Sequence, residues 1–285
     1  MRRLLQVLGA VAPASLLAAC GGGVSESPFI EPATSRGYVV WARRDHDRTR
    51  PAPVLFALHA YATSPEVLVR AFALVPRAAA SRGWILVAPA GTRDGAGKLS
   101  WNASAACCGI GPQRPDDVEF LHRVLEDVRR RIAVDPERVY AIGVSNGAFM
   151  AHRWACAPSG DLRAIVSIAG AAQGPDDPPC TPSVPVSVLH VHGDEDQTIR
   201  YQGGSADGAR YPSARESAGF WRNANGCSPE ATVTRRRSFL FGDSRIESWS
   251  GPRARVALWT VEGGAHHIRA LRFDAEEMLA FLEGK

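Results

Sequence analysis

The sequence predicts an α/β protein with a mostly parallel central sheet and helices on both of its faces. Short runs rich in β-branched and aromatic residues alternate with segments of helical periodicity, which is the pattern of consecutive βαβ units. Several of these runs are apolar without interruption, as expected of strands buried on both faces. A chain of 285 residues with 45% hydrophobic side chains can bury a sizeable core, and one domain is the expected organisation.

The N-terminal nineteen residues predict an export signal, because Arg2 and Arg3 precede an apolar stretch that is too short to span a bilayer. The signal ends in LAACG, which resembles a bacterial lipoprotein box and predicts that Cys20 becomes the lipidated first residue of the mature chain. An ordinary signal with cleavage nearby is the alternative. Residues 20–37 are rich in Gly, Ser and Pro and are expected to form a flexible tether. We therefore expect a membrane-anchored lipoprotein on the periplasmic or extracellular face, or a secreted protein if Cys20 is not lipidated.

Residues 38–285 are expected to form the single folded domain, in which apolar runs mark the strands. The strand candidates are YVVWA (38–42), PVLFALH (53–59), WILVAP (84–89), RVYAIGV (138–144), RAIVSIAG (163–170) and VPVSVLHVHG (184–193), and a later strand ends at Glu262. Helices are expected at 65–81, 117–132, 146–157 and 273–284. Acidic residues support two of these helix starts, Asp116 and Asp117 at the second helix and Asp274 at the last. The remaining regions 91–115 and 203–251 are expected to supply loops over the carboxyl edge of the sheet.

Charge and cysteine content limit the partners. The net charge of +4 falls to +2 without Arg2 and Arg3, which is too balanced to indicate a nucleic-acid partner. Five cysteines remain once Cys20 is set aside, and in an oxidising compartment they predict two disulfides and one free thiol. Because a bridge between neighbours strains the peptide that joins them, Cys107 and Cys108 are expected to have separate partners. The paired spacing of a structural zinc site is missing.

The segment Gly143-Val144-Ser145-Asn146-Gly147 matches the motif G-x-S-x-G between an apolar strand and a helix. In such a motif the serine is a nucleophile that needs a histidine base and a carboxylate. Two later strand ends supply them, HVHGDEDQTIRY with Asp194 and Asp196, and VEGGAHH with His266 and His267. Asp196 lies 51 residues after Ser145, and His266 lies 70 residues after Asp196. The sequence thus predicts the order Ser, Asp, His, with both the acid and the base open to an alternative.

Ordered blocks of the sequence resemble α/β-hydrolases of the polyhydroxybutyrate depolymerase and feruloyl esterase type. The matching blocks are FALHAY, SWNASAACCG, DDVEFL, DPERVYAIGVSNGAFMAHRWAC, VLHVHGDED and VEGGAHH. The resemblance runs from about residue 38 to the C-terminus and implies an α/β-hydrolase fold. Carried over by position, it implies Ser145 as nucleophile, Asp196 as the orienting acid and His266 as the base.

An ester's tetrahedral intermediate needs two backbone donors for its oxygen. The N–H of Asn146, directly after the nucleophile, is expected to be one of them. The resemblance implies the N–H of Tyr61 as the second, although the chain has Ala60 where the family usually has glycine. The family's equivalent loop also implies that Trp101 walls the substrate cleft, while a core position is the other interpretation of a tryptophan.

These residues predict a serine esterase that works through an acyl-enzyme, with no cofactor and no metal. Feruloylated or acetylated polysaccharides and hydroxyalkanoate oligomers are the candidate substrates. An acyltransferase or peptidase with the same triad is one alternative, and a non-catalytic binding lipoprotein of the cell surface is another. His190 and His192 could be taken for metal ligands, but a structural role within the sheet is favoured. His59 is expected to be a hydrogen-bonded scaffold residue, and Cys156 a disulfide partner.

Overall fold

The computed structural model describes residues 23–47, 49–108, 114–236, 243–266 and 275–285. The expected signal at 1–19, the lipidation site Cys20, Asp274 and His267 lie outside these described residues. Among the helices that the structure does describe, none is long and apolar enough to cross a membrane.

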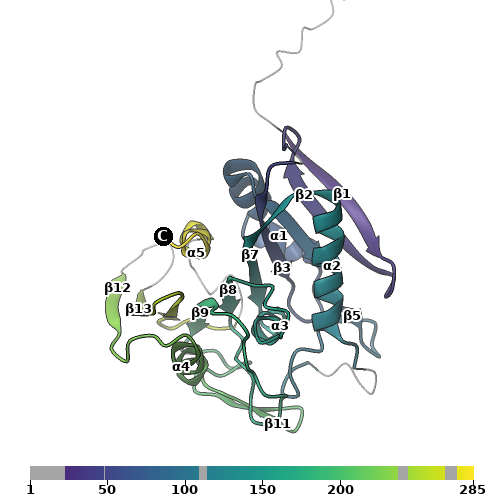
Figure 1. The fold of residues 1–285 in the computed structure, drawn as a ribbon. Coiled ribbons are helices and arrows are strands. Elements are labelled where there is room, and N and C mark those ends of the chain that lie inside the picture. Colours follow the sequence, from purple (N-terminus) through teal and green to yellow (C-terminus); the bar gives the residue numbers. More distant parts are fainter. Residues whose placement is uncertain (1–22, 48, 109–113, 237–242, 267–274) are drawn as a thin grey trace, which may run out of the picture.

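Ten strands of the described chain form one sheet, which confirms the predicted α/β class (Figure 1). Their order is β1-β2-β4-β3-β7-β8-β9-β14-β13-β12. The central strands from β4 to β14 are parallel, and antiparallel strands complete both ends. Their bounds are β1 Val24–Glu31, β2 Arg36–Arg43, β3 Ala52–Leu58, β4 Ile85–Pro89, β7 Val134–Val144, β8 Ala164–Ile168, β9 Ser187–Gly193, β12 Thr232–Arg236, β13 Ser244–Ser250 and β14 Arg255–Val261.

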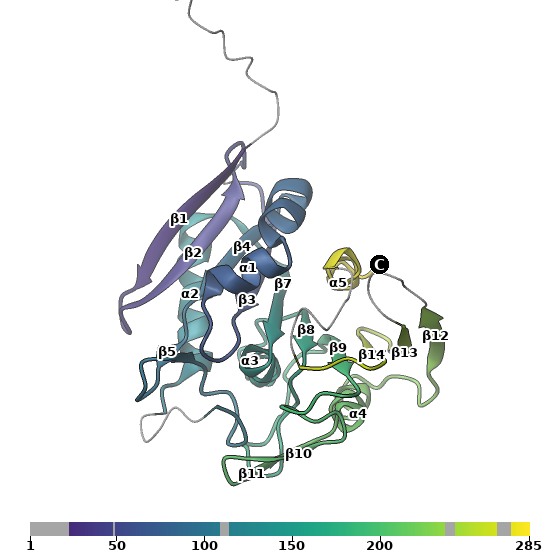
Figure 2. The ribbon, with the colours of Figure 1, turned by 180° about the vertical axis from the view of Figure 1, so that it is seen from behind.

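Helices cover both faces of the sheet. One layer contains α2 (Asp117–Arg131), α3 (Asn146–Ala155) and α4 (Ala214–Ala224), and the other contains α1 (Pro65–Ala71), a π-helical segment (Val75–Ala80) and α5 (Ala275–Leu282). Alternation along β3 builds both cores, because Val54 and Phe56 pack under the first layer while Leu55 and Ala57 pack under the second. Figures 1 and 2 agree in placing α4 and α5 on opposite sides of β9.

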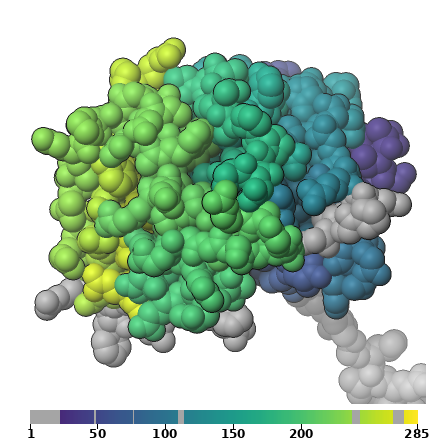
Figure 3. Space-filling model, turned by 90° about the horizontal axis from the view of Figure 1, so that it is seen from below, coloured from purple at the N-terminus to yellow at the C-terminus, as the bar shows by residue number. Residues whose placement is uncertain are grey.

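Two short hairpins lie outside the main sheet. One joins β5 (Thr92–Arg93) to β6 (Leu99–Ser100), and the other joins β10 (Gly204–Ala206) to β11 (Ala209–Tyr211). The β10–β11 hairpin lies at the bottom of Figure 1. Seen from below, this face is largely made by residues from the second half of the chain, drawn green, which lie between yellow residues near the C-terminus and teal and blue residues from earlier segments (Figure 3).

The expectation of a flexible tether at residues 20–37 is wrong for Val24–Glu31. These residues form the edge strand β1, which pairs antiparallel with β2 along its whole length. Phe29 stacks on Tyr38 at 5.4 Å between ring centroids, and Pro28 is tolerated because an edge strand leaves one row of N–H groups unpaired. The folded domain therefore begins about fourteen residues before the predicted boundary at residue 38.

Two other expectations need correction. The helix predicted over residues 65–81 breaks after Ala71, where Ala73 takes a positive φ of 48°, and a π-helical segment follows. The region 203–251, expected to be loops, contains α4 and the strands β12 and β13. Helix α4 buries only one face, through Ala214, Ala218 and Trp221. Its apolar pattern is therefore weak among the many Gly, Ser and Arg residues of this region.

The structure contains two disulfides, but their pairing differs from the expectation. Cys156 pairs with Cys180, while Cys107 and Cys108 bond each other, and Cys227 is free within the described chain. Cys108 has a positive φ of 67°, which turns the chain so that the two neighbouring side chains face the same side. The prediction of separate partners for Cys107 and Cys108 is therefore wrong.

Candidate active site

Three predicted site residues follow three strands that lie close together in the sheet. Ser145 directly follows β7, Asp196 lies three residues beyond β9, and His266 lies five residues beyond β14. The strands from β7 through β8 and β9 to β14 are parallel neighbours. Because the carboxyl ends of parallel strands meet at one edge, residues 121 positions apart in the sequence come into contact there.

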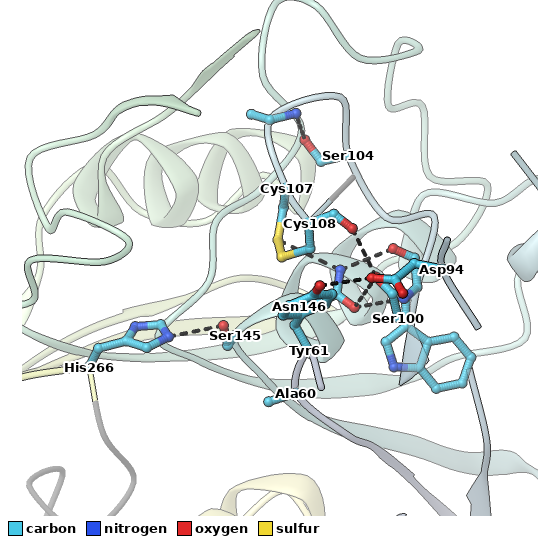
Figure 4. The surroundings of a disulfide bond; sticks show 12 residues. Ala60, Tyr61, Asp94, Ser100, Ser104, Cys107, Cys108, Ser145, Asn146 and His266 are labelled. Carbon is cyan, nitrogen blue, oxygen red and sulfur yellow. Dashed lines mark hydrogen bonds between the residues drawn. A yellow bond between two sulfur atoms is a disulfide. The ribbon is translucent and has the colours of Figure 1, made fainter. Parts of the chain in front are cut away.

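His266 joins the other two residues through its two ring nitrogens. Its Nδ1 lies 2.8 Å from Oδ2 of Asp196. Its Nε2 lies 3.0 Å from Oγ of Ser145, a contact that Figure 4 shows. Since a carboxylate can only accept, Nδ1 carries the proton, and Nε2 is left to accept the serine hydroxyl. The arrangement can therefore take a proton from Ser145 while the buried carboxylate fixes the tautomer and steadies the charged ring.

The structure favours Asp196 over Asp194. The Asp194 side chain is exposed and accepts a hydrogen bond from the N–H of Gly263 at 2.7 Å, so it braces the turn after β14. Asp196 is only 2% exposed and contacts the histidine. His267, the alternative base, lies outside the described residues.

Ser145 is held in a backbone conformation that its two neighbouring glycines make possible. Its φ of 53° and ψ of −117° lie in a region that L-residues rarely adopt, as a sharp turn between β7 and α3 requires. A Cβ on Gly143 would lie 2.1 Å from the carbonyl oxygen of Gly147, and a Cβ on Gly147 would lie 2.1 Å from that of Leu58. Both glycines are needed because main chain approaches main chain here.

Asp196 is held by four donors. Its Oδ1 accepts from the N–H groups of Thr198 at 2.8 Å and Ile199 at 2.9 Å, while its Oδ2 lies 2.8 Å from His266 and 3.3 Å from Nε2 of His192. Burial by itself would raise the pKa of Asp196, but hydrogen bonds from His192 and His266 lower it far below its usual range. The carboxylate is therefore charged at any pH at which the protein would work.

Behind Asp196 lies a row of buried histidines that reaches across the core. His192 Nε2–H is shared between the carbonyl of Ile199 at 2.7 Å and Oδ2 of Asp196 at 3.3 Å, which leaves its Nδ1 to accept from Nε2–H of His190 at 3.2 Å. His152 lies next to His190, with 5.7 Å between ring centroids, and accepts a hydrogen bond from Trp221. In the described chain no three His, Cys, Asp or Glu side chains are grouped to hold a metal ion. The row connects Asp196 to the core through hydrogen bonds, and the contact between His192 and Asp196 is one that the sequence pattern does not reveal.

These buried rings predict acid destabilisation. Burial lowers the pKa of His59 to about 4 and of His152 to about 3, whereas the unfolded chain titrates near 6.5. Because the folded-state pKa values are depressed, this stability is present above pH 6.5 and is lost as the pH falls towards 4. We expect each ring to cost about 2 kcal/mol of unfolding free energy between pH 7.5 and pH 5. Urea titrations at the two pH values measure the loss, and His152→Gln should reduce it by the share of one ring. An unchanged pH dependence in His152→Gln would contradict the assignment.

The second side of the site is the loop after β3. His59 is buried, and its Nδ1–H donates to the carbonyl of Ala60 at 2.8 Å while its Nε2 accepts from the N–H of Gly91 at 2.9 Å, which confirms its scaffold role. Tyr61 follows in the same loop, and its exposed ring donates its hydroxyl to Asp94 (Figure 4). Asn146 is the first residue of α3, so its N–H has no partner within the helix. Both N–H groups expected to bind an oxyanion thus belong to segments beside Ser145.

Trp101 does not line a cleft. Its side chain is fully buried between His59 and Phe120, and its Nε1–H donates to the carbonyl of His59 at 3.0 Å. The expectation that Trp101 contacts substrate is wrong, because the indole is the core support of the loop that carries Tyr61. The core interpretation of this tryptophan is the one that the structure bears out.

The side chain of Asn146 forms a clamp that the sequence does not signal. Its Oδ1 accepts from the N–H of Trp101 at 2.7 Å, and its Nδ2 donates to the carbonyl of the same residue at 3.0 Å. Asn225 makes the same kind of clamp on Val186, with distances of 3.2 and 2.7 Å, at the start of β9. Asn146, the residue directly after the serine, therefore fixes the neighbouring loop through its side chain.

This pair of clamps allows a controlled prediction. Asn146→Ala should lower the unfolding free energy by about 2–3 kcal/mol, because it removes both hydrogen bonds to Trp101 and leaves the buried N–H of that residue unpaired. It should also lower kcat/KM for esters by tenfold or more, on the order of a misplaced substrate contact. Asn225→Ala should cost similar stability and leave kcat/KM within about twofold. Urea unfolding and ester kinetics on the same preparations make the comparison, and equal kinetic losses in the two variants would contradict a role of the Asn146 clamp in the site.

Comparisons with known proteins give the site a context. No family model matches the sequence. The chain is 26% identical over 176 residues to "Feruloyl esterase B" of Piromyces equi, which covers 59% of this chain and 31% of that protein. It is 28% identical over 237 residues to "Putative esterase NocK" of Nocardia uniformis, which covers 75% of this chain and 64% of that protein. The chain thus spans about a third of the length of the first relative and just under two thirds of the length of the second.

Solved structures support the fold. The acetyl xylan esterase from Aspergillus awamori matches 92% of this chain and 100% of its own, with a TM-score of 0.65 at 13% identity. A Bacillus cereus carboxylesterase matches 88% and 95%, with a TM-score of 0.56 at 14% identity. With its parallel sheet and its serine on a sharp turn after β7, the chain has the α/β-hydrolase fold and resembles feruloyl esterases in sequence.

Proposed function

We propose that the protein is a serine esterase that hydrolyses carboxylic esters through an acyl-enzyme. The observation that carries the proposal is the continuous chain of hydrogen bonds from Asp196 through His266 to Ser145, at 2.8 and 3.0 Å. The sequence similarity to proteins named esterases supports the same reaction class.

Each step of the reaction has a group to perform it. His266 Nε2 accepts the hydroxyl proton as Oγ of Ser145 attacks the ester carbonyl, and the N–H groups of Asn146 and Tyr61 stabilise the negative oxygen. When the intermediate collapses, the same proton passes from His266 to the departing alcohol. Water then enters and attacks the acyl carbon while His266 takes its proton, and this proton passes to Oγ of Ser145 as the bond to the acyl group breaks and the acid leaves. Asp196 stays charged throughout and steadies the protonated ring.

The proposed substrates follow from the relatives and from the predicted export. Feruloylated or acetylated polysaccharides fit the names of proteins similar to this chain, a feruloyl esterase and an acetyl xylan esterase. Hydroxyalkanoate oligomers remain a candidate from the resemblance of the motif blocks. A panel of these esters compared by kcat/KM identifies the preferred class. Product analysis with a competing alcohol separates hydrolysis from acyl transfer, because both start from the same acyl-enzyme.

A fluorophosphonate probe tests the proposal directly. We expect the folded wild-type protein to be labelled on Ser145 and Ser145→Ala to remain unlabelled, with the labelled peptide identified by mass spectrometry. Activity should be indifferent to chelator, since none of the proposed groups needs a metal. A folded wild type that neither takes the label nor hydrolyses any ester would instead support the non-catalytic binding protein.

The proposed location is the cell envelope, with the protein held to a membrane by lipid on Cys20. The sequence LAACG around Cys20 is the basis of this proposal. Metabolic labelling with a radioactive fatty acid tests it, with Cys20→Ala as the control. Equal labelling of the two proteins, or none of the wild type, would favour an ordinary cleaved signal.

A further inference from the structure

The Cys107–Cys108 disulfide lies against the start of α3, next to the nucleophile. Asn146 Nδ2 is 3.6 Å from Sγ of Cys107, and Figure 4 shows the two sulfur atoms between their own loop and the segment from Ser145 to Asn146. Cys107 is 5% exposed and Cys108 is partly exposed, so the pair is partly accessible at the molecular surface.

The loop that carries the disulfide is fixed on two sides. Next to α3, Ser100 Oγ donates to the carbonyl of Cys108 at 3.0 Å, and the Asn146 clamp holds the preceding turn. On the other side, Asp177 accepts from Ser104 Oγ at 2.8 Å and from the N–H of Ala105 at 2.6 Å. The two sulfurs are therefore presented in one position by an anchored loop.

A bridge between adjacent residues does little for global stability. A disulfide stabilises mainly by closing a loop of the unfolded chain, and the gain grows with the length of that loop. Cys156–Cys180 closes a separation of 24 residues, whereas Cys107–Cys108 closes a separation of one. The Cys107–Cys108 disulfide must therefore act locally, through the shape and the chemistry of the surface that it forms.

Its position defines which part of an ester it would meet. His266 contacts Oγ of Ser145 from one side, where the proton must be delivered to the departing alcohol. The disulfide contacts Asn146, whose N–H lies on the oxyanion side, and Figure 4 draws it away from His266 across Ser145. With the alcohol towards His266 and the oxyanion towards Asn146, the acyl group is left to extend along the disulfide.

We propose that the Cys107–Cys108 disulfide forms an apolar wall of the acyl-binding side of the site and selects esters with large, above all aromatic, acyl groups. The proposal rests on the proposed esterase function and names the determinant of its acyl specificity. A disulfide carries no charge and bonds water weakly, and sulfur is polarizable and makes favourable contacts with aromatic rings. A wall of this kind discriminates through apolar contact, in the range of tenfold and above per group lost.

The test varies the acyl group while the alcohol stays the same. Wild type and the double variant Cys107→Ser/Cys108→Ser are compared on p-nitrophenyl acetate, butyrate and cinnamate. We expect kcat/KM for the acetate to stay within about threefold and kcat/KM for the cinnamate to fall about tenfold or more, with the butyrate between them. Acetates of phenol and 1-naphthol, which differ only in the alcohol, should keep their wild-type ratio.

Two further samples test whether an effect comes from a general loss of structure. Cys156→Ser/Cys180→Ser removes the other disulfide and should lower the unfolding midpoint without changing the acyl preference. Wild type reduced with a phosphine tests the wall without substitution, since the phosphine is oxidised and the disulfide opens to two thiols. Applied to the variant that lacks Cys156 and Cys180, this reduction acts on the Cys107–Cys108 disulfide alone and should lower the preference for cinnamate.

Equal losses on all acyl groups would overturn the wall and assign the disulfide to the support of Asn146. A change in the preference for the alcohol would place it on the wrong side of Ser145, and an unchanged acyl preference would remove it from the site. If the wild type hydrolyses none of the five esters and takes no fluorophosphonate label, the esterase proposal itself fails, which is a separate result.

Discussion

Ser145→Ala is expected to lower kcat for p-nitrophenyl acetate by about ten-thousand-fold or more, because it removes the hydroxyl that forms the acyl-enzyme in the proposed mechanism. The fold should survive the change. The main-chain conformation of Ser145 is set by close contacts at Gly143 and Gly147, and alanine keeps the same Cβ. Steady-state kinetics and urea unfolding on the same sample measure both quantities, with the unfolding free energy expected within about 1 kcal/mol of wild type.

The partner residues supply the control for this prediction. Asp196→Asn should lose activity on a comparable scale, since an amide at this position can present its NH2 group and favour the wrong tautomer of His266. Asp194→Asn should retain wild-type kcat, because Asp194 braces a turn through Gly263. Full activity in Ser145→Ala would exclude the proposed mechanism, and a large loss in Asp194→Asn together with an active Asp196→Asn would reassign the acid.

Gly147→Ala is expected to be strongly destabilising. The added Cβ would lie 2.1 Å from the carbonyl oxygen of Leu58 and 2.6 Å from that of His59, and main chain cannot move aside as a flexible side chain does. The start of α3 must separate from the end of β3. We expect a loss of at least about 3 kcal/mol of unfolding free energy, as for severe overpacking, together with a loss of activity.

Gly219→Ala is the matched control for that change. Gly219 lies within α4, and no atom lies within 4 Å of the position of an added Cβ. Alanine is favoured over glycine inside a helix, so this variant should gain about 0.5–1 kcal/mol. Urea unfolding of the two variants tests whether close approach, and not the loss of glycine as such, is what matters. A Gly147→Ala protein of wild-type stability would show that the main chain can separate there without cost.

The parallel core of the fold could be predicted from the sequence because its strands are continuous apolar runs. The six strand candidates correspond to β2, β3, β4, β7, β8 and β9, each to within a few residues. What escaped prediction is partly exposed. β1 has polar residues and Pro28, and β12 is exposed along its length, so neither carries an apolar signal. Such edge strands depend on a partner strand that no local pattern reveals.

The site residues also include some that the sequence could predict and some that it could not. Ser145, Asp196 and His266 could be proposed because each follows a strand in a recognisable order, and the structure brings the three together. The interpretation of Trp101 as a substrate contact failed because burial depends on Phe120 and His59, which are remote in the sequence. The Asn146 clamp could not be foreseen for the same reason, since its partner lies 45 residues away.

The place of β14 in the sheet has a consequence for how the chain matures. This last strand enters between β9 and β13, and it is followed closely by His266. A chain in which residues 255–261 are not yet paired leaves the edges of β9 and β13 open, and it has not yet brought His266, the proposed base, to Ser145. Open edges of this kind invite pairing with other chains. The pairing of β14 therefore closes the two edges most prone to aggregation and, under the proposed function, brings the base to the nucleophile in the same step.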